Sequence, residues 1–136
     1  MEKESPRESL EEVAKRNMAV WLATLKTKNP EEVSRLYAEK HTFLPTVSGK
    51  FRKGKDEAED YFEHFLAKNP EGEVIEEEIQ PVGENAYVHS GMYNFKVDGE
   101  ERRAIIPARF TYVWQKGSDG QWQIIHHHSS ARPEGD

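Results

Sequence analysis

The chain contains no cysteine among its 136 residues. This absence excludes disulfides, thiolate nucleophiles and cysteine-ligated zinc sites. An excess of positive charge is also missing, because 19 Lys and Arg stand against 25 Asp and Glu, for a formal net charge of −6. Nucleic acids and anionic membranes are bound by basic surfaces, so we expect neither of them as a partner.

Long hydrophobic runs are missing as well. No apolar stretch approaches the ~20 residues that a membrane-spanning helix requires. The first eight residues, MEKESPRE, are polar and charged, which is not typical of a secretory signal. We therefore expect an intracellular protein of the cytoplasm. The length suits one domain over residues 9–130, between polar tails at 1–8 and 131–136 that we expect to be disordered.

The spacing of apolar residues changes character near residue 72. Before this point they recur at every third or fourth position, which predicts amphipathic helices over about 9–27 and 55–67. Asn29-Pro30 indicates the start of a short helix between them, which we expect to bury Val33, Leu36 and Tyr37. A small hairpin is expected around Ser48-Gly49.

The second half of the chain reads as strands. We expect strands over 74–82 and 86–97, a return strand that ends near Trp114, and a last strand over 122–130. Asp98-Gly99 is a strong signal for a two-residue hairpin turn. Three helices followed by four antiparallel strands predict an α+β domain, in which a bent sheet wraps around the first helix. The other face of such a sheet stays partly apolar.

The C-terminal hairpin RFTYVWQKGSDGQWQIIHHHSS carries Val-Trp, Gly-Gln-Trp-Gln-Ile and His-x-His elements. It resembles the end of the calcium/calmodulin-dependent protein kinase II association (hub) domain, and AVWLATLKTKNPEEVSRLYAEKHTFLPT and DYFEHFLAKNP fit the same order of elements. The chain is also similar to free-standing bacterial domains of the NTF2-like, SnoaL-like superfamily. This resemblance implies an NTF2-like cone, with one long and two shorter helices packed in a curved antiparallel sheet. It also implies dimers and, in hub relatives, stacked rings.

Two functions follow from the resemblance, because this superfamily includes enzymes, binding proteins and assembly domains. We expect a stand-alone, hub-like scaffold that associates with itself and has a kinase or a small molecule as a further partner. The chain itself has no kinase motif such as His-Arg-Asp or Asp-Phe-Gly. The alternative is a small SnoaL-like enzyme or ligand-binding protein, with His128 and Tyr112 as its acid/base and hydrogen-bonding pair. We favour the scaffold.

A ketosteroid-isomerase-like enzyme needs a carboxylate in its pocket. The five aspartates fall in a helix, in turns and in the tail, and the consecutive residues Glu76, Glu77 and Glu78 are typical of a solvated strand. The sequence therefore disfavours a carboxylate base, with Glu77 and Glu63 as the remaining candidates.

The triplet His126-His127-His128 is the most conspicuous local feature. Strand alternation places His126 and His128 on one face and His127 on the other. A His-x-His pair can present two imidazoles to one metal, with a further ligand from His41, His64 or His89. We favour hydrogen-bonded packing instead, and expect no metal and no cofactor.

Successive side chains also point to opposite faces on the strand that contains Arg109. The aromatic residues after it face the first helix, so Arg109, Thr111 and Val113 face outward, and we expect them to form a subunit interface together with His127. By the register of the resemblance, the basic cavity positions of hub domains fall on Met92, Tyr112 and Ser129, none of which is basic. We therefore expect a smaller, neutral ligand pocket. Its expected lining is Trp21, Phe43, Met92, Tyr112 and His128.

Overall fold

The computed structural model describes residues 8–46 and 48–135, and the expected tail at 1–8 lies outside these residues except for Glu8. In this part of the chain, no helix is both long and apolar enough to cross a membrane. The helices are α1 (Leu10–Leu25), α2 (Pro30–Ser34) and α3 (Gly54–Leu66). The strands are β1 (Tyr37–Leu44), β2 (Arg52–Lys53), β3 (Glu71–Pro81), β4 (Ala86–Asp98), β5 (Arg103–Lys116) and β6 (Trp122–Ala131).

The long first helix is confirmed, although it ends two residues earlier than predicted. It begins after Ser9, whose hydroxyl accepts a hydrogen bond from the Glu12 N–H at 3.1 Å. It is followed by Lys28, which adopts a left-handed backbone conformation with φ of 57°. Its apolar stripe is buried against the sheet, and Trp21 is its largest buried side chain. The stripe thus fixes which face of α1 the sheet covers.

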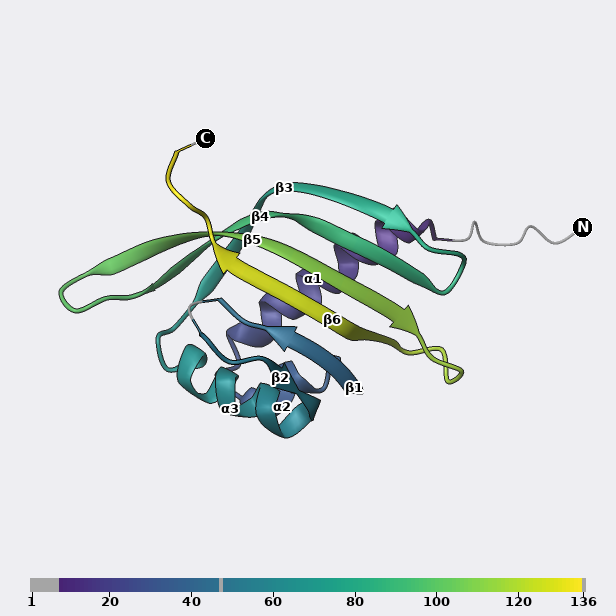
Figure 1. Cartoon of the computed structure of the whole chain (residues 1–136), viewed down its shortest axis with the longest axis horizontal. Helices are drawn as coiled ribbons and strands as arrows, with labels where there is room; N and C mark the ends of the chain where they lie inside the picture. The colour runs from purple at the N-terminus through teal and green to yellow at the C-terminus, as the bar shows by residue number, and fades with distance from the viewer. Residues whose placement is uncertain (1–7, 47, 136) are drawn as a thin grey trace, which may run out of the picture.

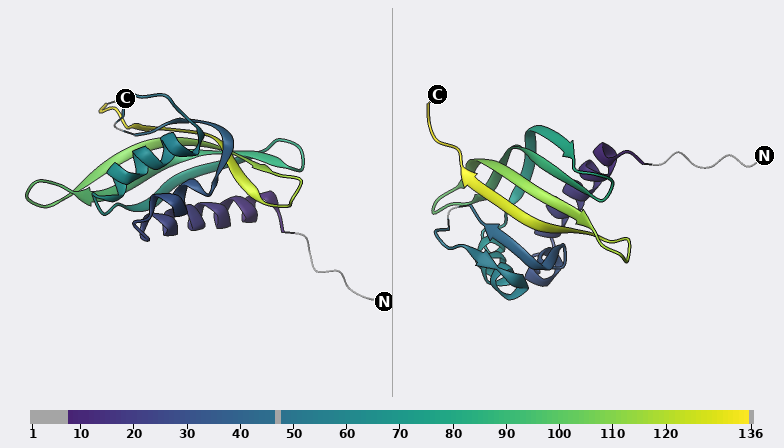
Figure 2. Two further views of the ribbon diagram at one scale, coloured as in Figure 1. Left: turned by 90° about the horizontal axis from the view of Figure 1, so that it is seen from below. Right: turned by 45° about the vertical axis from the view of Figure 1, so that its right-hand side comes forward.

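One sheet contains all six strands, in the order β2-β1-β6-β5-β4-β3. Figure 1 shows α1 crossing behind the sheet, with α2 and α3 beside β1 and β2 at its lower edge. Figure 2 shows the curvature of the sheet around the helices and the β4–β5 hairpin projecting beyond them. The predicted α+β cone is confirmed, with the helices on one side of the sheet in the described part of the chain.

The sheet is mixed, where the sequence predicted antiparallel strands alone. Tyr37, expected on the short helix, opens β1, and this strand runs parallel to β6. It also forms the predicted small hairpin with β2, where Phe43 pairs with Arg52. The parallel partners Thr42 and His126 are 84 residues apart in the chain. Local spacing does not encode a pairing over such a distance, so the sequence pattern missed it.

Two β-bulges change the strand faces. On β3 the register shifts between Val74 and Glu76, opposite β4. On β6 the register shifts after Ile124: Trp114 pairs with Ile124, and Val113 pairs with His126, so that Ile125 is the extra residue. A bulge of one residue reverses the faces of all residues that follow it.

The β4–β5 turn is also displaced from its predicted position. Asp98 pairs with Arg103, and the N–H of Gly99 donates to the carbonyl of Arg102 at 2.9 Å. The turn is therefore centred on Glu100 and Glu101 rather than on Asp98-Gly99. At the other end, β6 extends to Ala131, and the Arg132 N–H donates to the Pro107 carbonyl at 2.8 Å.

We call the side of the sheet that contacts the helices the inner face, and the opposite side the outer face. Direct cross-strand partners share a face, so the pairings define three neighbouring rows in the middle of the outer face. These rows are Gln80, Val88, Val113, His126 and Thr42; Glu78, Ser90, Thr111, His128 and Leu44; and Glu76, Met92, Arg109 and Ser130.

Candidate functional site

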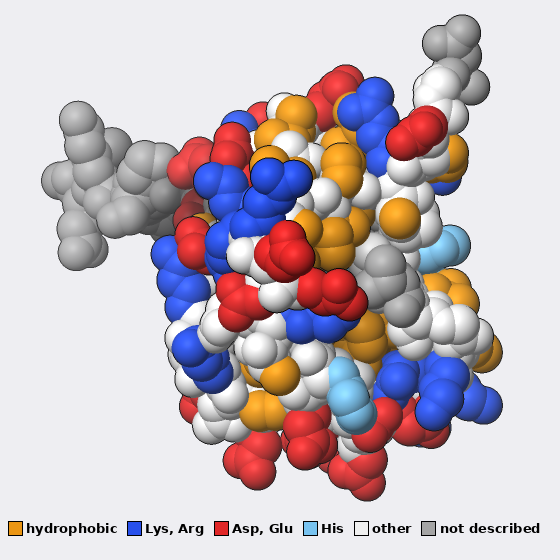
Figure 3. Space-filling view, turned by 90° about the vertical axis from the view of Figure 1, so that its left-hand side faces the viewer, with side chains coloured by type: hydrophobic (Ala, Val, Ile, Leu, Met, Phe, Trp, Pro, Cys, Tyr) orange, Lys and Arg blue, Asp and Glu red, His pale blue; other side chains and the backbone are white. Residues whose placement is uncertain are grey.

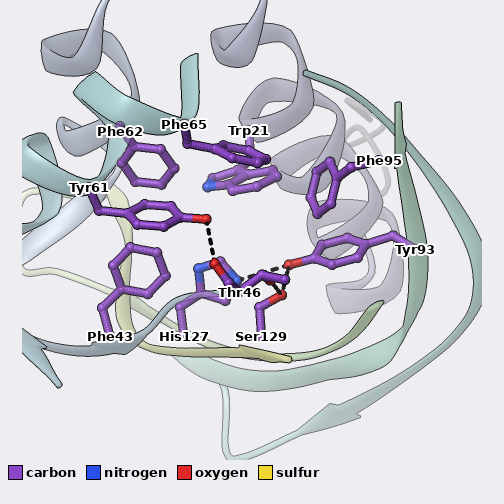
Figure 4. Close-up of a pocket in the computed structure, with 10 residues that line it drawn as sticks. All are labelled: Trp21, Phe43, Thr46, Tyr61, Phe62, Phe65, Tyr93, Phe95, His127 and Ser129. Atoms are coloured by element: carbon purple, nitrogen blue, oxygen red, sulfur yellow. Dashed lines mark hydrogen bonds between the residues drawn. The ribbon is translucent and has the colours of Figure 1, made fainter. Parts of the chain in front are cut away.

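An aromatic cavity lies between the inner face of the sheet and helices α1 and α3. Figure 4 shows the rings and hydroxyl groups that converge on it. Its lining residues come from both halves of the chain: Trp21, Phe43, Thr46, Tyr61, Phe62, Phe65, Tyr93, Phe95, His127 and Ser129. The free space measures about 10 Å³. This volume is enough for about one water molecule.

A directed chain of hydrogen bonds crosses this cavity. The Trp21 indole N–H, which only donates, bonds to the Tyr37 hydroxyl oxygen at 3.0 Å. The Tyr37 hydroxyl lies 2.8 Å from Nδ1 of His127, and Nε2 lies 3.2 Å from the Tyr93 hydroxyl. Tyr93 donates to the Ser129 hydroxyl at 2.7 Å. Because Tyr93 has a single proton, Nε2–H of His127 is the donor to Tyr93, and Nδ1 of the neutral imidazole accepts from Tyr37. The bond from Tyr93 to Ser129 thus assigns the tautomer of the histidine.

His127 is held on both of its ring faces. Its imidazole stacks against Tyr112 at a centroid distance of 3.9 Å and against Phe43 at 4.8 Å. Only 2% of its surface is exposed, and this burial holds the pKa of His127 well below its ordinary value. Burial likewise raises the pKa of Tyr37 well above its ordinary value. Both groups stay neutral at neutral pH, which suits a role in orientation rather than proton transfer.

The cavity lacks the carboxylate that an isomerase would need, since none of its lining residues is acidic. Glu63, one of the two remaining candidates, is exposed on α3. The hydroxyl groups instead satisfy one another: Tyr61 donates to the Thr46 carbonyl at 3.1 Å, and the hydroxyls of Thr46 and Ser129 hydrogen-bond. The polar wall is therefore largely self-contained.

Glu77, the other candidate, forms a second polar contact under α1. Its carboxylate accepts a hydrogen bond from Nε2 of His89 at 2.8 Å, while Nδ1 of His89 has no partner among the described residues. His89 is fully buried, and this burial lowers the pKa of the imidazole, although the Glu77 hydrogen bond opposes the shift. The β3 bulge turns Glu77 inward, which consecutive glutamates did not reveal.

The structure brings together only part of the expected pocket. Trp21 and Phe43 line the cavity, and Tyr112 lies beside it against His127. Met92 and His128 do not point into it, because both belong to the outer face. The expected position of His128 in the pocket is wrong, because the β6 bulge turns His127 inward and His128 outward.

The same bulge explains why two other expectations, for His127 and for the pair of His128 and Tyr112, are wrong. His127 was expected at an interface but lies in the core at 2% exposure. The pair of His128 and Tyr112 does not form, because Tyr112 is directly opposite His127 in the ladder. An acid/base pair of these two residues is therefore absent from the cavity.

Sequence reasoning missed Tyr93 and Tyr37, the two hydroxyls that hold the imidazole. Alternation along β4 carries a signal for Tyr93, since Tyr87, His89, Tyr93 and Phe95 are all buried odd-numbered positions. Met92 was placed inside by the register of the resemblance, and this alternation contradicts it. Tyr37 gave no such signal, because its spacing from Val33 also fits a helix.

The outer face has a neutral centre and a charged edge. Arg109, Thr111 and Val113 lie on it as expected, with Thr111 and Val113 half-buried and Arg109 exposed. The acidic residues of its three middle rows, Glu76 and Glu78, belong to the edge strand β3. Figure 3 views the molecule from the end where the β4–β5 hairpin projects, and shows acidic and basic side chains crowded beside hydrophobic ones.

Comparisons with known proteins agree on the fold. The family model of the calcium/calmodulin dependent protein kinase II association domain matches residues 11–133. A candidate association domain of this kind from Xanthomonas campestris is 36% identical, with a TM-score of 0.89 over 98% of this chain and 95% of that one. No curated protein matches the chain significantly.

Two more distant structures share the fold alone. An NTF2-like superfamily protein from Salmonella enterica is 17% identical, with a TM-score of 0.77 over 91% of this chain and 92% of that one. A candidate ketosteroid isomerase from Parabacteroides distasonis is 19% identical, with a TM-score of 0.70 over 100% of this chain and 98% of that one. The expected NTF2-like architecture is thereby confirmed.

Proposed function

Because the chain belongs to the calcium/calmodulin-dependent protein kinase II association domain family, we propose that it is a self-associating scaffold whose copies dock through the outer face. The observation that carries this proposal is the composition of the middle of that face. Its three middle rows hold three charged side chains, Glu76, Glu78 and Arg109, whereas the outer face near the β4–β5 turn carries Lys96, Asp98 and Arg103. A neutral centre with charges toward the edge is typical of protein interfaces.

The size of the outer face bears on the same function. The four strands β3 to β6 at the usual spacing are roughly 19 Å wide, and three rows that are two residues apart span roughly 20 Å along them. The resulting area, on the order of 400 Å², is about half of the roughly 800 Å² per partner that a standard interface buries. The neighbouring rows of the outer face have to contribute the rest of the contact.

A two-fold axis along the strands, between β4 and β5, gives these copies a complementary fit. Each row then lies over the same row of the partner, since such an axis keeps the strand direction. Val88 approaches the partner's Val113, and Ser90 approaches the partner's Thr111. Glu78 approaches the partner's His128. Apolar pairs at the centre and opposite polar groups toward the edge favour this arrangement.

The enzyme or ligand-binding alternative gains no comparable support. A cavity of about 10 Å³ leaves no room for a cyclic substrate. Its buried imidazole is already bonded on both nitrogens.

Native mass spectrometry or analytical ultracentrifugation tests the scaffold. We expect a mass of twice 15.7 kDa, or a higher multiple, at micromolar concentration. Val113→Glu at the centre of the outer face should shift the protein toward the monomer. Val20→Glu is the matched control, because Val20 is 44% exposed on α1, away from the sheet's outer face. A wild-type protein that stays monomeric at these concentrations contradicts the proposal.

A further inference from the structure

The β6 bulge also determines which histidines lie on the outer face. After Ile125 the strand alternates again, so His126 and His128 both point to the outer face, with buried His127 between them. Two imidazoles at positions i and i+2 of a strand lie side by side on one surface. This places two nitrogen ligands of the kind that zinc, nickel and copper prefer next to each other.

Thr42 orients the first of these imidazoles. Its hydroxyl lies 2.7 Å from Nδ1 of His126 across the parallel β1–β6 pair. When Nδ1–H donates to this hydroxyl, Nε2 keeps its lone pair for a metal. Metal-binding histidines commonly donate their other N–H to an oxygen in this way.

A single copy cannot complete the site. No cluster of three or more His, Asp or Glu side chains suited to a metal occurs within the described residues. His41 and His89, two of the further ligands considered from sequence, are buried on the inner side at 3% and 0% exposure. Zinc requires at least three protein ligands in most of its sites. The remaining ligand must therefore come from another molecule.

The docking geometry proposed above supplies such a ligand. Glu78 and His128 belong to one row, on β3 and β6, the two strands that lie equally far from the gap between β4 and β5. A two-fold axis between β4 and β5 brings each of them to the other in the partner. Glu78 is exposed and forms no ion pair among the described residues, so its carboxylate is available.

We propose that His126 and His128 of one copy and the partner's Glu78 bind a divalent transition-metal ion of the zinc class, twice per dimer. The site rests on the proposed self-association through the outer face. It makes the scaffold metal-responsive, because each ion joins two copies and binding favours the associated state. Arg109, in the adjacent row, repels a cation, and the negative charge of the partner's carboxylate offsets this repulsion.

Zinc titration by calorimetry, combined with sedimentation of the full chain, tests the site. We expect about one Zn²⁺ per chain and tighter association when zinc is present. His128→Gln and Glu78→Gln should each lower the zinc affinity by about tenfold or more. Both should also remove the zinc effect on association. The matched controls are His64→Gln and Glu63→Gln, which change exposed side chains on α3.

The outcomes separate the two proposals. Metal-free association that zinc does not alter overturns the metal site and leaves the scaffold intact. Zinc binding that is equally strong in wild type and Glu78→Gln overturns the shared site. A chain that stays monomeric without zinc and with it overturns both. Far-ultraviolet circular dichroism of each variant establishes that the fold is unchanged.

Discussion

The two faces of the sheet differ in how their side chains are satisfied. On the inner face, rings stack on rings, and Trp21 lies within 6.3 Å of Phe62, Tyr93, Phe95, Tyr112 and His127 by centroid distance. The groups around His127 bond to one another, although the Tyr112 hydroxyl, the Trp114 indole N–H and Nδ1 of His89 have no partner among the described residues. On the outer face, Thr111 and Val113 are half-buried, whereas Arg109 and His128 are exposed. The inner face is filled by its own rings, whereas the outer face remains open to solvent in a single copy.

Truncation of Trp21, at the centre of the aromatic cluster on the inner face, should give the largest loss of stability. Trp21→Ala removes a ring that is 1% exposed, together with the N–H that starts the hydrogen-bond chain. We expect a loss of about 3–5 kcal/mol in the free energy of unfolding, measured by urea denaturation. Val113→Ala on the outer face should cost about 1 kcal/mol or less. Equal losses in the two variants would contradict the distinction between the faces.

A smaller loss is expected where two backbones meet at the β3 bulge. A Cβ at Gly91 would overlap the carbonyl oxygen of Glu76 and lie 2.8 Å from Cα of Glu77. Backbone atoms cannot turn aside as a flexible side chain can, so Gly91→Ala should lower the free energy of unfolding by about 2–3 kcal/mol. Thermal and urea unfolding measure this loss.

The control for that substitution is Gly49→Ala, since a Cβ at Gly49 meets no atom within 4 Å. Its effect should stay within about 0.5 kcal/mol. A neutral Gly91→Ala would show that the bulge can relax and that the inward position of Glu77 is not fixed.

The smallest effect concerns the pH dependence of stability, and it comes from the buried side chain of His127. The pKa of His127 is lowered by burial in the folded protein, so below about pH 6.5 the unfolded chain binds a proton that the folded chain excludes. Stability from this group is therefore complete above the unfolded pKa and is lost as the pH falls. The slope is about 1.4 kcal/mol per pH unit for one such histidine.

Urea denaturation between pH 7.5 and pH 5 checks this slope. His127→Gln should reduce the slope by about the contribution of one proton, in addition to a constant loss from the broken hydrogen bonds. A His127→Gln variant with the same slope as wild type would mean that this imidazole is not the buried group behind the pH dependence.

Local pattern was sufficient for most of the fold. Helical spacing located α1 and α3, and alternation with turn residues located β3 to β6 within a few positions. The candidate site was harder to predict from the sequence. Alternation along β4 identifies Tyr93 as buried, but the exchange of His127 and His128 depends on one extra residue at Ile125. Nothing in the letters Ile-Ile-His-His-His marks where that residue is inserted.

By itself, the sequence determined the class of the domain, its family resemblance and the apolar stripe of its first helix, because these depend on residues close together in the chain. Only the tertiary structure decided which histidine lies in the cavity, how the hydrogen bonds around it are arranged and how β1 joins the sheet. These features depend on register between distant strands. A shift of one residue there exchanges inside for outside without changing the local pattern.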